Sequence, residues 1–223
     1  MQDTSLKELQ VLDSPSKGDQ DQLEQLHLPT VVTSQFTSNF SGTPIYSDAA
    51  WSLEPGQDEA PADIGVFLQL TGHHTGHLYI SAVSPPVVSA LQGEAYGLLL
   101  AVKIAAQLHV QDPKFLTDSA VLASAILEPD VSKEGPWAIR PILAAIQTIP
   151  SFQPCRISKV HRSMNFKAHH HARLAVKIQN KPFNSTCLHS NHVLGSNPEQ
   201  CPMCNVLSAM SALPLKLLIV KCA

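Results

Sequence analysis

The chain has 223 residues, with 15 basic and 18 acidic side chains, a formal net charge of -3 and a hydrophobic fraction of 44%. This length can bury one sizeable core with extensions, and the charge excludes a generally polycationic protein. Five cysteines are an odd number, which argues against a disulfide framework and favours a reducing compartment.

Charge is distributed unevenly along the chain. Residues 1–63 carry many acids, whereas residues 135–198 contain no acid at all. A local basic region can bind phosphate, because such binding depends on local rather than total charge; a solvated surface is the simpler interpretation. The basic residues of this region are Arg140, Arg156, Lys159, Arg162, Lys167, Arg173, Lys177 and Lys181.

Residues 1–42 are rich in Gln, Asp, Ser and Thr, which predicts a disordered or weakly ordered lead-in. The first residues lack the basic-then-apolar pattern of a signal peptide. The longest apolar run near the end, residues 213–220, is too short to span a bilayer. We therefore expect a soluble intracellular protein, nuclear or cytoplasmic, with no membrane partner.

Three strands are predicted in succession, at residues 43–51, 64–70 and 78–83. Each is rich in β-branched and aromatic residues, and turn-like loops separate them, which indicates an antiparallel meander. The Pro85-Pro86 pair is expected to end the third strand, because proline cannot donate to a β-ladder.

The rest of the chain alternates helices and strands. The expected ranges are a helix at 87–110, a strand at 114–118, helices at 119–127 and 136–149, a strand at 156–160 and a helix at 165–178. This order predicts an α/β fold with a mixed sheet of five strands, in which the first three strands are antiparallel and helices flank the sheet.

Three acids occupy notable places in this pattern. Asp48 lies within the first strand, Asp118 lies at a strand-to-helix junction, and Glu94 shares an apolar helix stripe that points inward. If strands one and four are neighbours, the three carboxylates converge. Such a cluster suits hard divalent cations such as Mg²⁺, and two such ions can clamp the attacking water and the leaving oxygen of a phosphodiester.

Each acid also has a simpler interpretation when taken alone. Asp48 could face water on an edge strand. Asp118 could cap the following helix, and Glu94 could be a first-turn acid near a helix dipole. The ordered trio, rather than any single acid, supports the metal site.

Four stretches resemble a known family. They are Ile45-Tyr46-Ser47-Asp48-Ala49-Ala50-Trp51, Ala90-Leu91-Gln92-Gly93-Glu94-Ala95, Phe115-Leu116-Thr117-Asp118-Ser119, and Val160-His161-Arg162-Ser163-Met164-Asn165-Phe166-Lys167-Ala168-His169. Across residues 44–178 the chain resembles the RNase H-like superfamily, and most closely the RNase H type 1 domains of plant retroelement-derived, reverse transcriptase-associated proteins. The resemblance implies an RNase H-like domain at residues 43–180.

The resemblance also implies an activity, namely metal-dependent hydrolysis of the RNA strand of RNA–DNA hybrids. Asp48, Glu94 and Asp118 would then be catalytic ligands of two Mg²⁺ or Mn²⁺ ions, with Asp48 bridging both. His169 stands where the family usually has a fourth Asp, as plant retroelement-type members often do. It is expected to act as the fourth metal ligand, although Mg²⁺ prefers oxygen to nitrogen.

Four further residues are expected to contact the nucleic acid by the same resemblance: Ser119, His161, Arg162 and Asn165. An alternative function stays open, which is a domesticated, weakly active or inactive domain that binds nucleic acid or a protein partner. The His169 substitution and the acidic N-terminal part favour this alternative, whereas the intact acidic trio favours the enzyme.

Residues 181–223 are expected to form a C-terminal extension. Cys201 and Cys204, with Cys187 and His189 upstream, could bind zinc, which takes four nitrogen or sulfur ligands. The upstream spacing is irregular, so ordinary thiols are favoured over a zinc site. Residues 217–222 could add an edge strand to the sheet.

Overall fold

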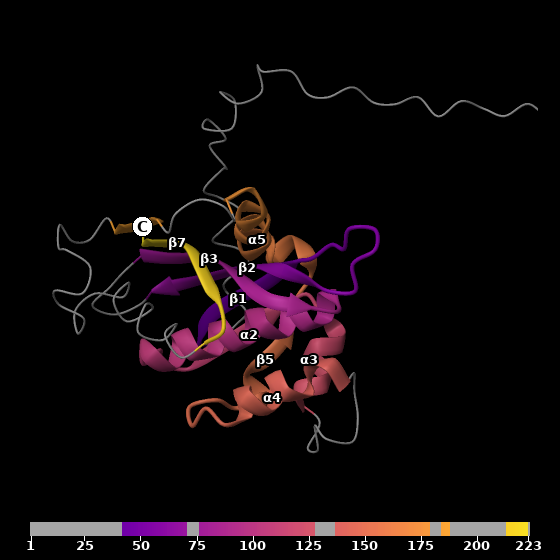
Figure 1. The fold of residues 1–223 in the computed structure, drawn as a ribbon. Coiled ribbons are helices and arrows are strands. Elements are labelled where there is room, and N and C mark those ends of the chain that lie inside the picture. Colours follow the sequence, from indigo (N-terminus) through magenta and orange to yellow (C-terminus); the bar gives the residue numbers. More distant parts are fainter. Residues whose placement is uncertain (1–41, 71–75, 128–136, 179–183, 188–212, 223) are drawn as a thin grey trace, which may run out of the picture. The chain divides into compact units, whose positions relative to one another are not determined.

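The computed structural model describes residues 42–70, 76–127, 137–178, 184–187 and 213–222. These residues form a single sheet whose two faces are covered by helices: α2, α3 and α4 lie on one side and α5 on the other (Figure 1). The interpretations of residues 1–41 as a disordered lead-in and of Cys201 and Cys204 as a possible zinc site fall outside the described residues.

The sheet confirms the predicted mixed topology. Strands β1 (Thr43–Ala50), β2 (Ala60–Leu70) and β3 (Gly76–Val87) form an antiparallel meander, and β4 (Pro113–Thr117) and β5 (Ile157–Lys159) run parallel to β1 on its other side. The strand order is β5-β4-β1-β2-β3-β7-β6. Strand β1 is therefore central, with β2 and β4 as its neighbours.

Within the described residues the sheet has seven strands, rather than the predicted five. Strand β7 (Lys216–Cys222) pairs antiparallel with β3, so residues 217–222 do form a strand, but β6 (Asn184–Cys187) lies beyond it at the edge. The sequence gives no sign of β6, because its four residues, Asn-Ser-Thr-Cys, show no hydrophobic alternation.

Strand β3 does not end at its prolines, contrary to expectation, but continues through Pro85 and Pro86 to Val87. Strand β7 pairs with β3 only as far as Val83, so the prolines lie beyond that ladder. The ladder with β2 is also irregular nearby, between Pro61 and Asp63. Proline is tolerated here because no backbone donor is required toward β7.

The helices are α2 (Ala90–Gln107), α3 (Ala120–Leu127), α4 (Arg140–Gln147) and α5 (Phe166–Ile178). Helix α2 begins with a reciprocal cap: Ser89 Oγ accepts a hydrogen bond from the Gln92 amide, and the Gln92 side chain accepts one from the Val88 amide. These bonds satisfy backbone donors that a helix start leaves unpaired and fix the direction in which α2 leaves β3.

Helix α5 lies unusually close to the sheet. A Cβ atom added to Gly65 of β2 would be 2.0 Å from the carbonyl oxygen of Ala168 and 2.4 Å from the backbone nitrogen of Ala172. The two alanines are fully buried. Since backbone meets backbone at this crossing, neither element can shift to accommodate a side chain.

No helix in the described parts of the chain is long and apolar enough to cross a membrane.

The close crossing can be tested by replacing Gly65 with alanine. We expect Gly65→Ala to lower the free energy of unfolding by about 2–4 kcal/mol, because the added methyl group has no room, as in other overpacked cores. Urea denaturation followed by circular dichroism measures this loss.

Gly97→Ala is the matched control, since an added Cβ there would be 3.5 Å from its nearest neighbour, an ordinary contact. Its stability should stay the same or rise by up to about 1 kcal/mol, because alanine favours a helix. Equal stability of Gly65→Ala and the parent protein would contradict the close crossing.

Candidate active site

The carboxylates of Asp48, Glu94 and Asp118 lie together: each offers one oxygen, and these oxygens are all within 4.8 Å of one another. They come from β1, from α2 and from the residue that follows β4. The parallel register pairs Tyr46 with Leu116, so continuing it by two residues places Asp48 opposite Asp118. Strand adjacency thus brings these two acids together.

Asp118 does not cap helix α3. Ser119 takes that role, because its Oγ accepts a hydrogen bond from the amide of Leu122, while Thr117 Oγ1 accepts one from the amide of Ser119. The carboxylate of Asp118 is therefore not needed as a helix cap, and it lies beside those of Asp48 and Glu94.

Glu94 points from α2 toward the sheet. The helix is held close there, because a Cβ added to Gly93 would be 2.6 Å from Cβ of Ala62. Glu94 lies beyond the first turn of α2, so it does not serve that turn's backbone amides. Among the described residues, its buried Oε2 has no hydrogen-bond partner. A buried acceptor without a partner is costly, and a bound cation would satisfy it.

His169 of α5 and Asn165, the residue before this helix, complete the cluster. His169 Nδ1 lies 2.6 Å from Asp48 Oδ2. Asn165 is fully buried, and its Nδ2 donates to Asp118 Oδ1 at 3.1 Å and to the carbonyl of Ser47 at 2.9 Å. One amide thus connects β1 to the residue that follows β4, and it holds Asp118 in position.

The environment disfavours charge on two of the acids. Burial, followed by the charge and hydrogen bond of Asp48 and the charge of Asp118, raises the pKa of Glu94 to about 9. Burial also raises the pKa of Asp48, against the lowering effect of hydrogen bonds from Glu94 and His169. Carboxylates crowded in this way are typical of sites that a cation completes.

The trio opens into a cavity of about 430 Å³. Besides the three acids and His169, two arginines line it: Arg162 and Arg173. The remaining wall consists of Ala49, Ala50, Trp51 and Ala90. The three alanines leave room beside the acids, and two arginine side chains line the same cavity.

The other residues expected to contact nucleic acid lie nearby but outside this lining. His161 is exposed, and its Nδ1 lies 2.8 Å from Ser163 Oγ at the turn before α5. Ser119 caps α3, as described above. Arg173 also lines the cavity, although it was not among the predicted site residues. Its position four residues after His169 on a predicted helix is the signal that could have identified it.

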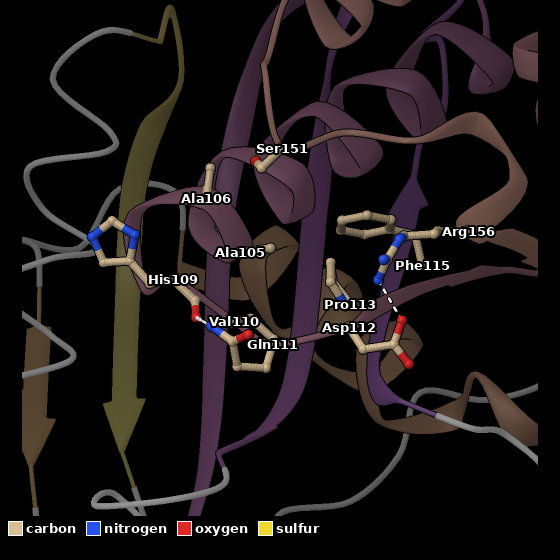
Figure 2. A pocket seen from close by; sticks show the side chains of 10 residues that line it. All are labelled: Ala105, Ala106, His109, Val110, Gln111, Asp112, Pro113, Phe115, Ser151 and Arg156. Atoms are coloured by element: carbon tan, nitrogen blue, oxygen red, sulfur yellow. Dashed lines mark hydrogen bonds and ion pairs between the residues drawn. The ribbon is translucent and has the colours of Figure 1, made fainter.

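A second cavity, of about 280 Å³, lies at the far end of α2, between its last turn and the start of β4 (Figure 2). An ion pair between Asp112 and Arg156 crosses its edge. It contains none of the candidate site residues.

A family described as reverse transcriptase-like matches residues 56–175, more than half of the chain. The chain belongs to the reverse transcriptase-like family. The match includes Glu94, Asp118 and His169, and Asp48 precedes it. The predicted membership of the RNase H-like superfamily is confirmed, as is the mixed α/β fold of that superfamily.

Among solved structures, this reverse transcriptase-like chain is similar to RNase H1 from the archaeon Halobacterium salinarum, with 18% identity, 60% of this chain and 97% of that one covered, and a TM-score of 0.48. The N-terminal RNase H domain of a Mycobacterium tuberculosis protein has 18% identity, 61% and 98% coverage and a TM-score of 0.46.

A third structure is LC11-RNase H1, isolated from compost and determined in complex with an RNA/DNA hybrid; it has 19% identity, 62% and 99% coverage and a TM-score of 0.48. No curated protein matches the chain.

The raised pKa of Glu94 predicts a pH-dependent stability in metal-free protein. Because Glu94 ionises more readily in the unfolded chain, the free energy of unfolding falls as pH rises from the ordinary pKa of this group, 4.5, through its folded pKa of about 9. Glutamine has no proton to lose, so the free energy of unfolding of Glu94→Gln should increasingly exceed that of the parent from pH 5 to pH 9.

We expect Glu94→Gln to be the more stable protein at pH 9 by about 1–3 kcal/mol, or a few degrees of Tm. Thermal unfolding in EDTA at several pH values measures the difference. A difference independent of pH would contradict the burial of this carboxyl.

Proposed function

We propose that this reverse transcriptase-like protein is an RNase H-type endonuclease that hydrolyses the RNA strand of RNA–DNA hybrids with Mg²⁺ or Mn²⁺. The observation that carries the proposal is the convergence of Asp48, Glu94 and Asp118, whose oxygens lie within 4.8 Å of one another. A solvated acidic surface does not fit, because Asp48 is only 3% exposed.

The residues present suit a hard divalent cation. Three carboxylates supply oxygen ligands, and the buried Oε2 of Glu94 lacks a partner among the described residues. Asp48, Glu94 and Asp118 would hold the metal, with His169 beside Asp48. Bound there, divalent cations would supply an activated water and stabilise the charge that develops on the leaving oxygen.

The protein's own groups would prepare this chemistry. Asn165 holds Asp118 through its amide, so the carboxylate that follows β4 keeps its direction. The exposed guanidinium of Arg162 lines the cavity and can bind a phosphate of the hybrid. Ser119 and His161 stay predicted substrate contacts, and a plant retroelement origin stays a prediction of the sequence.

A second candidate function is binding of nucleic acid or a protein partner without cleavage. The observation that favours it is His169, which replaces a charged oxygen ligand and contacts Asp48 rather than standing within the group of three carboxylates. A domesticated domain could keep its fold and its basic surface after losing activity. Cleavage assays distinguish the two.

Asp48→Asn tests the enzyme directly. The change keeps size but removes the charge of the most buried acid, so cleavage of a hybrid labelled on its RNA strand should fall at least about 100-fold in Mg²⁺ or Mn²⁺. Asp58→Asn, at an exposed position outside the cavity, should cleave as the parent does. If the parent protein cleaves no hybrid at any metal concentration, the enzyme proposal is wrong and the binding function is favoured.

His169→Asp tests the fourth position. Aspartate offers Mg²⁺ the oxygen that it prefers, so the ratio of Mn²⁺-supported to Mg²⁺-supported cleavage should fall by about tenfold, and Mg²⁺ should raise the Tm more than in the parent. His170→Asp, at the exposed neighbouring position, should leave both quantities near the parent's. An unchanged ratio in His169→Asp would show that residue 169 does not contact the metal.

A further inference from the structure

We infer that Arg173 is a substrate-binding residue that holds a backbone phosphate of the nucleic acid beside the acidic trio. This inference rests on the proposed function and adds a contact that neither the family match nor the sequence motifs assign. It depends on the place of Arg173 on α5, on its charge surroundings and on its guanidinium, which has no ion-pair partner among the described residues.

The place of Arg173 is fixed by the helix that carries it. His169 and Arg173 are four residues apart, so they lie on one face of α5. His169 contacts Asp48, and Arg173 lines the same cavity as the three acids. The backbone contact between α5 and Gly65 prevents the helix from turning or sliding, so Arg173 stays at this opening.

The charge surroundings indicate an anionic ligand. In the described parts of the chain, no carboxylate oxygen lies within the 4.0 Å of an ion pair from the guanidinium of Arg173 or of Arg162. Arg173 is exposed. An arginine that merely neutralised the trio would be paired with one of its carboxylates; this one keeps its donors for a ligand.

The proposed reaction explains why a positively charged side chain is useful at this position. A phosphodiester carries a negative charge, and three carboxylates disfavour its approach. A guanidinium at the cavity opening offsets that repulsion, and its planar donors suit two phosphate oxygens at once. A contact with phosphate, rather than with a base, would act equally on all sequences.

Lys177 provides a matched control. It follows Arg173 by four residues on α5 and is also exposed and cationic, but it does not line the cavity. The variants Arg173→Ala, Arg173→Lys and Lys177→Ala therefore separate a contact in the cavity from a general effect of positive charge on α5.

The test measures binding of an RNA–DNA hybrid in EDTA, by fluorescence anisotropy over a range of salt concentrations, together with KM and kcat in Mn²⁺. Arg173→Ala should bind about tenfold more weakly, and its plot of log K against log salt should be shallower by about 0.9, the value of one phosphate contact. KM should rise with kcat near the parent's. Arg173→Lys should keep the salt slope but bind more weakly than the parent.

Lys177→Ala should keep the parent's salt slope and KM, and all three variants should keep its Tm. If the parent binds and cleaves the hybrid while Arg173→Ala shares its slope and KM, the assignment of Arg173 is wrong and the proposed function stands. If the parent neither binds nor cleaves the hybrid, the proposed function is wrong and the assignment is lost with it.

Discussion

Mutual repulsion among three partly buried carboxylates is the constraint on which the architecture of this protein depends. Their oxygens lie within 4.8 Å of one another, and burial together with this crowding raises the pKa of Glu94 to about 9. Such a cluster opposes folding in the absence of a cation. The surrounding structure must therefore hold the acids where they would not stay by themselves, as is common at functional sites.

Helix α5 provides much of that support. It lies on β2 at Gly65 with no side chain between, so its first turns stand at a fixed position over the central strands. From there Asn165 reaches the backbone of β1 and the carboxylate of Asp118, and His169 reaches Asp48. The same helix places the guanidinium of Arg173 at the cavity opening. The segment formed by Asn165 and α5 thus orients the acids, supplies a histidine and carries the arginine that we assign to phosphate binding.

The histidine at position 169 separates this chain from the arrangement that its family resemblance implies. A fourth aspartate would add charge to a crowded acidic cluster, whereas a histidine adds a neutral or positive group and lowers the pKa of Asp48 through its hydrogen bond. Under the proposed function, position 169 would therefore ease the crowding of charge around Asp48 but would offer Mg²⁺ a nitrogen in place of the oxygen that it prefers.

How much of the fold the sequence reveals depends on where the hydrophobic pattern is strong. Strands β1 to β3 and helix α2 follow alternation or apolar periodicity, so their order and the mixed topology are predictable. Strand β6 and the passage of β3 through Pro85 and Pro86 are not, because each depends on which strand lies alongside. The helical spacing of His169 and Arg173 indicates that they share a face of α5, but not that this face borders the cavity of the three acids.

The amino-acid order by itself determined the three acids and the elements that carry them, because these follow from residue type and local periodicity. It also indicated the family, through the resemblance of four short stretches. Only the tertiary structure decided that Ser119 rather than Asp118 caps α3, that Asn165 holds Asp118, and that Arg173 shares the cavity of the trio. Two of these facts are contacts or a shared cavity between segments distant in the chain, and the contact of Asp118 with Asn165 goes with the capping of α3 by Ser119 instead. Local residue preferences predict helices and strands, but they do not predict which distant segments meet.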